Sequence, residues 1–131
     1  MEALPLRLTP GADLRGALEA LLRERGWEAA FVLAGIGSLS EARLRLANER
    51  ETRVVAGPLE LLSLAGTLSP DGPHLHASVA DAHGATMGGH VAPGCIVRTT
   101  AELLLAPLPG WRFARRLDAQ TGWAELEIEP S

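Results

Sequence analysis

The sequence has 131 residues, of which 47% are hydrophobic, and its formal net charge is −4 at neutral pH. This length suits one domain with a single core, and no apolar run reaches the roughly 18 residues that a membrane span needs. We therefore predict one domain over residues 1–131 with no membrane partner. The N-terminus lacks the basic and apolar regions of an export signal, so we expect a cytoplasmic location.

Two compositional features limit which metal ligands and which binding partners are possible. Cys95 is the only cysteine, which excludes a disulfide framework and a thiolate-rich zinc module. Any metal must therefore be held by histidine and carboxylate. The basic residues are all arginines and are scattered along the chain, whereas nonspecific nucleic-acid binding depends on clustered positive charge. We expect no direct nucleic-acid binding unless folding or assembly gathers these arginines into a patch.

The N-terminal quarter predicts one strand and one helix. Residues 4–8 alternate leucine with other residues, as in a strand with one buried face. After the break at residues 9–11, Asp13 is a suitable N-cap, and Gly26 can end the helix. Apolar residues recur between them at helical spacing; they are Leu14, Ala17, Leu18, Leu21 and Leu22.

From Trp27 onward the pattern changes to period two or to short apolar runs, which predicts strands. The predicted strands are 30–34, 42–46, 59–68, 75–79, 103–106, 111–115 and 123–128. Turn signals lie between them; they are 35–38, 56–58, 69–72 and 107–110. The expected fold class is α/β of the α+β type: a compact single domain with a mostly antiparallel sheet and one long N-terminal helix packed on it.

All four histidines fall between His74 and His90, which is the strongest local bias in the sequence. Residues two apart on a strand point to the same face, so His74 and His76 project together while the alternate apolar residues face the core. If residues 82–84 form a three-residue loop with Gly84 in the left-handed conformation, His76 faces His90. A loop of two or four residues would put His90 on the opposite face.

Three neutral imidazoles suit Zn²⁺, with a fourth position open for water, carboxylate or substrate. Another divalent transition metal, such as Ni²⁺, is also compatible with these ligands. The spacing is equally compatible with ordinary polar strand residues bonded to backbone or water. No catalytic residue is assigned. Polar or small neighbours complete the candidate site; they are Glu60, Ser78, Gly88 and Gly89, the last two leaving room for a bulge or another backbone.

Two other motifs lie outside the histidine cluster. Residues 35–40 partly match a phosphate-binding loop, but Ser40 replaces its last glycine and a strand pattern follows, which favours a glycine-rich strand bend. Cys95 lies near His90 in sequence, yet a lone cysteine in an apolar strand is typical of a packing residue. Neither motif predicts a catalytic site.

Three segments follow one another in the chain: residues 34–42, residues 60–69, and residues 74–94 with His74, His76 and His90. In order and spacing this set resembles the plants-and-prokaryotes conserved (PPC) family, and the resemblance covers nearly the whole chain. The resemblance implies a compact domain with a mostly antiparallel sheet that assembles as a homotrimer. It also implies a bound metal ion at the three histidines in some prokaryotic members.

Plant relatives in this family join the domain to AT-hook segments and act as DNA-associated nuclear regulators. This chain has no Arg-Gly-Arg core of an AT-hook. Two functions are therefore expected. The first is a homotrimeric metalloprotein that binds a small molecule or catalyses a simple hydrolysis or lyase step. The second is a DNA-associated regulatory or assembly module that acts through protein partners.

Overall fold

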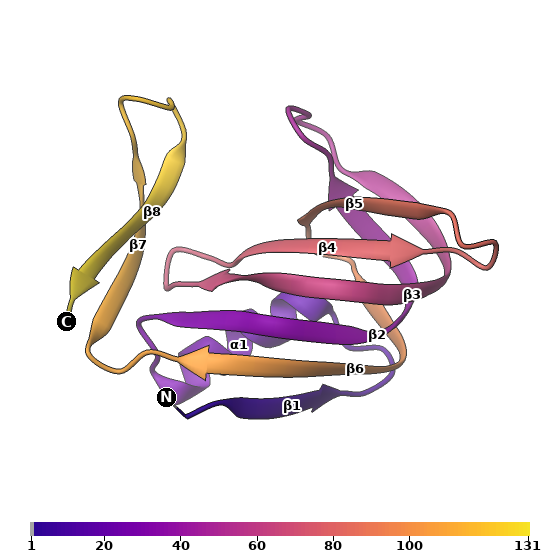
Figure 1. Ribbon diagram of the computed structural model, residues 1–131, viewed down its shortest axis with the longest axis horizontal. Coiled ribbons are helices and arrows are strands. Elements are labelled where there is room, and N and C mark those ends of the chain that lie inside the picture. Colours follow the sequence, from indigo (N-terminus) through magenta and orange to yellow (C-terminus); the bar gives the residue numbers. More distant parts are fainter. Residues whose placement is uncertain (1) are drawn as a thin grey trace.

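A computed structural model describes residues 2–131 (Figure 1), and within them lie eight strands and one helix. Their bounds, in chain order, are β1 Leu4–Leu8, α1 Leu14–Arg25, β2 Ala30–Arg45, β3 Arg53–Leu68, β4 His74–Ala80, β5 Thr86–Val91, β6 Ile96–Pro107, β7 Trp111–Leu117 and β8 Ala124–Pro130.

Six of the strands form one antiparallel sheet in the order β1-β6-β2-β3-β4-β5. The far end of β2 also pairs with β5, where Leu44 lies opposite Val91 and Arg45 opposite His90. Strands β2, β3, β4 and β5 therefore close into a small ring. The predicted antiparallel sheet is confirmed, and the closure fixes β5 along both of its edges.

The predicted fold class is wrong. Among residues 2–131 only α1 is helical, and its 12 residues span about 18 Å, so this is an antiparallel β fold with one short helix. The helix is short because its caps lie three turns apart. The Asp13 side chain accepts a hydrogen bond from the Gly16 amide at 2.7 Å, and Gly26 ends the helix in the left-handed conformation.

Two segments predicted as turns lie inside strands: residues 35–38 continue β2, and residues 56–58 continue β3. Both strands are bent by register shifts rather than ended. A side chain at Gly37 would collide with the carbonyl oxygen of Thr100 on β6. The glycines that suggested turns allow neighbouring strands to approach closely.

One hydrophobic core lies between α1 and the curved sheet, and each strand of the ring contributes alternate residues to it. Its largest fully buried side chains are Leu14, Leu18, Leu39, Leu44, Leu61, Leu64, Leu68, Leu75, Leu105, Val32, Val79 and Val97. Within the described part of the chain, no helix has the length and apolarity to cross a membrane.

Strands β7 and β8 form a separate two-stranded hairpin that stands apart from the six-stranded sheet (Figure 1). Phe113 is its one buried hydrophobic side chain, and its ring meets Phe31 of β2 edge to face at 5.8 Å. The Phe113 amide also donates to the carbonyl oxygen of Glu28 at 3.0 Å. The hairpin is thus attached to the main sheet near its base.

Candidate metal centre

The register of β4 and β5 brings His76 directly opposite His90. The loop between these strands follows the predicted form, because the Asp81 amide donates to the Ala85 carbonyl oxygen at 2.9 Å and Gly84 has a φ of +82°. The prediction of a three-residue loop at 82–84 is therefore confirmed. With that loop, His74, His76 and His90 share one face of the sheet.

His90 is held from two sides because β5 pairs with both β4 and β2. Its Nδ1 lies 3.1 Å from the carbonyl oxygen of Arg45. A carbonyl oxygen can only accept, so Nδ1 carries the proton and Nε2 keeps its lone pair for a metal. Gly89 permits this contact, because a Cβ at this position would lie 2.9 Å from the same oxygen.

The three imidazoles are close enough to share one ion. One ligand atom from each of His74, His76 and His90 lies within 4.8 Å of the others. The His74 and His90 rings are stacked with centroids 5.5 Å apart, and His76 is edge-on to both. On tetrahedral zinc with bonds of about 2.0–2.1 Å, ligand nitrogens lie about 3.4 Å apart. Small side-chain rotations would close the difference, so the three residues fit a metal ion.

The surroundings of His74 and His76 favour the neutral imidazole, which is the form that binds metal. Partial burial, followed by the charge of Arg115 and then by the other two histidines and Arg45, lowers the pKa of His74 to about 4. Partial burial and the neighbouring His90 also lower the pKa of His76. Protons therefore compete weakly for the nitrogens of His74 and His76 at neutral pH.

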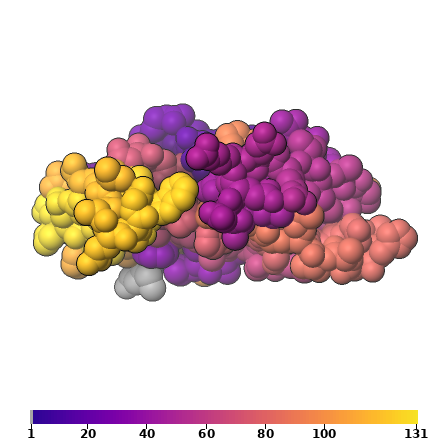
Figure 2. Space-filling view, turned by 90° about the horizontal axis from the view of Figure 1, so that it is seen from above, coloured from indigo at the N-terminus to yellow at the C-terminus, as the bar shows by residue number. Residues whose placement is uncertain are grey.

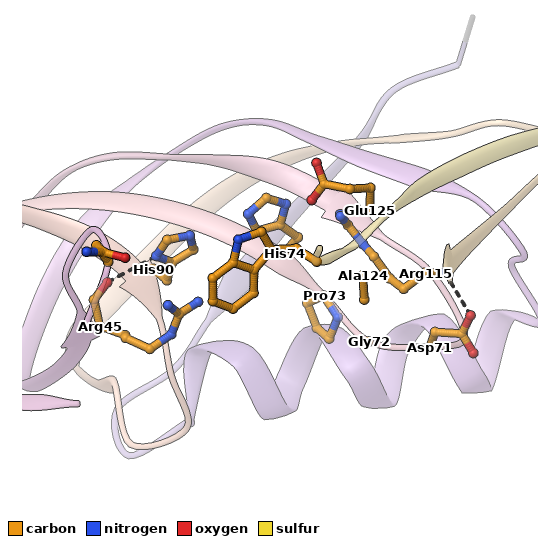
Figure 3. A pocket seen from close by; sticks show the side chains of 11 residues that line it. Arg45, Asp71, Gly72, Pro73, His74, His90, Arg115, Ala124 and Glu125 are labelled. Carbon is orange, nitrogen blue, oxygen red and sulfur yellow. Dashed lines mark hydrogen bonds between the residues drawn. The ribbon is translucent and has the colours of Figure 1, made fainter. Parts of the chain in front are cut away.

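A cleft of about 480 Å³ opens beside His74 and His90 (Figure 3). Arg45 and Asn48 line one side of it. The hairpin lines the other with Arg115 and residues 123–125. Seen from above, the yellow hairpin and the purple segment between β2 and β3 face each other (Figure 2). The volume is in the range of small-molecule sites.

Arg115 is fixed beside the histidines by contacts at both ends of the residue. Its backbone amide donates to a carboxylate oxygen of Asp71 at 2.9 Å, and its guanidinium donates to Oγ1 of Thr67 at 2.7 Å. Thr67 lies directly opposite His74 in the sheet. Arg45, Arg115 and Trp123 are not predictable as site residues from the sequence, because no local pattern links them to the histidines.

The other predicted neighbours lie elsewhere along the same strands. Ser78 lies on the same face of β4 as His74 and His76, but its hydroxyl shares a 2.6 Å hydrogen bond with Ser63 of β3, and Gly88 lies opposite Ser78. Glu60 lies opposite Ala80, four residues along β4 from His76, or about 13 Å at the rise of a strand. Gly89 is the neighbour that contacts the surroundings of His90.

Cys95 is a packing residue. It is 1% exposed, and its sulfur lies 3.3 Å from the Arg43 amide and 3.4 Å from the Arg43 carbonyl oxygen. Burial raises the pKa of the Cys95 thiol. A buried thiol of this kind is a poor nucleophile at neutral pH, so the interpretation of Cys95 as a core residue agrees with its surroundings.

Similar solved structures share this fold over almost their full length. A hypothetical protein from Salmonella cholerae-suis is 40% identical, with a TM-score of 0.95 over 98% of this chain and 94% of its own. A metal-containing protein from Archaeoglobus fulgidus is 28% identical, with a TM-score of 0.81 over 95% of this chain and 92% of its own.

Among curated proteins, the chain is 51% identical over 130 residues to the Bifunctional protein GlmU of Synechococcus sp. (strain JA-2-3B'a(2-13)). This match covers 99% of the chain but 21% of the relative, so the chain spans about a fifth of the relative's length. Residues 1–109, which hold all three histidines, match the sequence profile of the Plants and Prokaryotes Conserved (PCC) domain. The chain belongs to the PCC domain family, which is the family of the PPC resemblance.

Proposed function

We propose that this chain is a metal-binding domain in which His74, His76 and His90 hold a zinc ion and present its fourth position to a small ligand. The observation that carries this proposal is the approach of three imidazole nitrogens to within 4.8 Å of one another at the edge of an open cleft. Imidazole ligands are compatible with other divalent transition metals, of which zinc is the commonest for this ligand set.

The roles of the three histidines follow from their positions. His76 and His90 approach from paired strands, and the Arg45 carbonyl oxygen orients the His90 ring. His74 completes the set, and it lines the cleft together with His90. Zinc held in this way supplies a Lewis-acidic position at which water or an oxygen ligand can bind.

The exposure of the site supports a ligand-binding rather than a purely structural ion. Structural zinc sites are closed by four protein ligands, whereas functional sites keep a position open. Among residues 2–131, the histidine, cysteine and carboxylate groups that gather around a common point are these three histidines. His74 and His76 are exposed, and the adjoining cleft is accessible. The metal-containing relative from Archaeoglobus fulgidus adds support to a metal in this fold.

Metal analysis of protein purified without a histidine tag tests the proposal. We expect one zinc per chain in the wild type, and loss of zinc in His76→Ala and in His90→Ala. The matched control is His83→Ala, which removes a histidine at the tip of the β4–β5 loop and should keep its zinc. Stoichiometric zinc that persists in both site variants would exclude this site.

We also propose that the domain assembles as a homotrimer. The trimer follows from the family resemblance, and exposed apolar side chains on three adjacent strands support an interface. They are Leu33, Ile36, Leu62 and Leu104 on β2, β3 and β6. Contiguous apolar surface of this kind is typical of protein interfaces.

Light scattering measures the assembly directly. We expect a mass about three times the 13.8 kDa of the chain. Ile36→Glu places a charge at a side chain that is 54% exposed in the single chain, and should lower the mass towards that of a monomer. Leu117→Glu is the control, because Leu117 lies on the hairpin away from these strands. A monomeric wild type at micromolar concentration would contradict the trimer.

A further inference from the structure

Two arginines border the histidine cluster without a carboxylate partner. Within the described chain, neither Arg45 nor Arg115 has a carboxylate oxygen within salt-bridge distance. The exposed Arg53 and Arg116, by contrast, pair with glutamates at 2.8 and 3.1 Å. Both unpaired arginines line the cleft beside His74 and His90 (Figure 3).

The guanidinium of Arg115 is positioned by the protein and still has donors to offer. One of its nitrogens is bonded to Thr67, while the backbone of the same residue is fixed by Asp71. A guanidinium carries five N–H donors in a rigid fork that matches carboxylate and phosphate oxygens. The remaining donors are therefore available to a ligand.

The charges that line the cleft leave an excess of positive charge once the metal is bound. Arg45 and Arg115 are opposed by the carboxylates of Asp71 and Glu125. Asp71 already accepts from the Arg115 amide, and the negative charge of Glu125 acts on Arg115. The four side chains balance, so the two charges of a zinc ion on neutral histidines remain uncompensated. An anion is the ligand that would neutralise them.

The cleft also has an apolar surface beside this charge. Trp123, which is 66% exposed, lines it together with Pro73 and Ala124. An exposed indole at the rim of a polar site suits stacking against a flat or apolar ligand part. Charged and apolar side chains therefore line the same cleft.

We propose that this cleft binds a small organic anion, with its carboxylate or phosphate group between Arg45, Arg115 and the metal, and its apolar part against Trp123. This inference rests on the proposed metal site. Arg115 and Trp123 lie beyond residues 1–109, the part that matches the family profile, whereas the relatives in Synechococcus and Salmonella align over 98–99% of this chain. The family histidines thus hold the metal, and the hairpin selects the ligand.

Calorimetric titration of the zinc-loaded protein tests this with four probes. Phenyl phosphate and benzoate carry the two candidate anionic groups on one apolar ring, benzamide is neutral, and inorganic phosphate lacks the ring. We expect phenyl phosphate or benzoate to bind and benzamide not to bind. Which of the two anions binds more tightly identifies the anionic group.

The variants separate the roles of the side chains. Arg115→Gln and Arg45→Gln should each lower the affinity for the anion about tenfold or more, as expected for the loss of a charge-assisted contact. Trp123→Ala should weaken phenyl phosphate or benzoate but leave inorganic phosphate unchanged. Arg116→Gln is the matched control, because Arg116 is on the same strand and pairs with Glu127.

Two further measurements distinguish the failure of this inference from the failure of the metal site. Metal analysis of each variant reports whether the site is loaded, and the visible spectrum of the Co²⁺-substituted protein reports whether an anion reaches the ion. The inference is overturned if the zinc-loaded protein binds none of the anions, or if Arg115→Gln binds them as tightly as the wild type does. Either result leaves the proposed metal site intact. A wild type that takes up no zinc overturns both.

Discussion

The six-stranded sheet and the β7–β8 hairpin bury their side chains to very different extents. In the sheet, each strand of the ring alternates between a buried and an exposed face, and one continuous core runs through it. In the hairpin, Phe113 alone is buried among the described side chains, and Leu117, Trp123 and Ile128 are exposed. The sheet is held by packing, and the hairpin by a few contacts at its base.

This difference places two parts of the site on supports of unequal rigidity. The three histidines lie on β4 and β5, where hydrogen-bonded neighbours on both sides fix the backbone. Arg115 and Trp123 lie on the less buried hairpin. Ligands on rigid elements are positioned more accurately than those on loosely packed ones. Metal binding and anion binding should therefore respond separately to substitution.

The largest effect is expected for a substitution in the core of the sheet. Leu105→Ala removes a 0% exposed side chain near the C-terminal end of β6, and should lower the free energy of unfolding by about 3–4 kcal/mol. Leu117→Ala on the hairpin, where the side chain is 78% exposed, should change it by less than about 0.5 kcal/mol. Urea denaturation measures both. Equal losses would remove the distinction between the two regions.

A smaller effect is expected where the hairpin meets the sheet. Phe113→Ala removes the ring that packs on Phe31, and should cost about 2–3 kcal/mol because Phe31 itself is partly exposed. The zinc content should stay at the wild-type level, while binding of phenyl phosphate or benzoate should be lost. Hydrogen exchange of the β7 amides would show the detachment. Loss of zinc in this variant would mean that the hairpin supports the histidines directly.

The part of the fold that local rules govern was predictable. The caps of α1, the first strand and the loop at 82–84 depend on residues close together in sequence, and each was found as expected. The predicted turns at 35–38 and 56–58 were wrong, because their glycines lie inside strands. A glycine that marks a turn and one that admits a neighbouring backbone look alike in sequence, and the neighbour of Gly37 is Thr100, 63 positions away.

In the site, too, features set by residues close in sequence could be predicted, and features set by distant residues could not. The face shared by the three histidines followed from the alternation of a strand and the length of one loop. The surroundings of that face did not follow, because Arg115 reaches Thr67 across 48 positions and the β2–β5 pairing joins Arg45 to His90 across 45. No periodicity within one element encodes such contacts.

A moderate effect on metal affinity is expected from Gly89→Ala. The new methyl group would lie 2.9 Å from the Arg45 carbonyl oxygen, so β5 must move and the orientation of His90 is disturbed. Loss of such an orienting contact typically lowers metal affinity about tenfold. Competition with a zinc chelator measures the change. Gly88→Ala is the control, since its closest contact is 3.2 Å, and a larger loss there would contradict the role of Gly89.

The smallest expected effect is that of Arg115, on the hairpin, on the pKa of His74, on the sheet. In the metal-free protein the pKa of His74 is lowered from 6.5 to about 4, partly by Arg115. The unfolded chain therefore binds the proton more readily, so this contribution to stability is retained above pH 6.5 and lost as the pH falls towards 4. Arg115→Gln should raise the pKa of His74 and narrow that window, whereas Arg116→Gln should not. NMR titration of the His74 ring measures this. An unchanged pKa in Arg115→Gln would mean that the hairpin does not approach the histidines in solution.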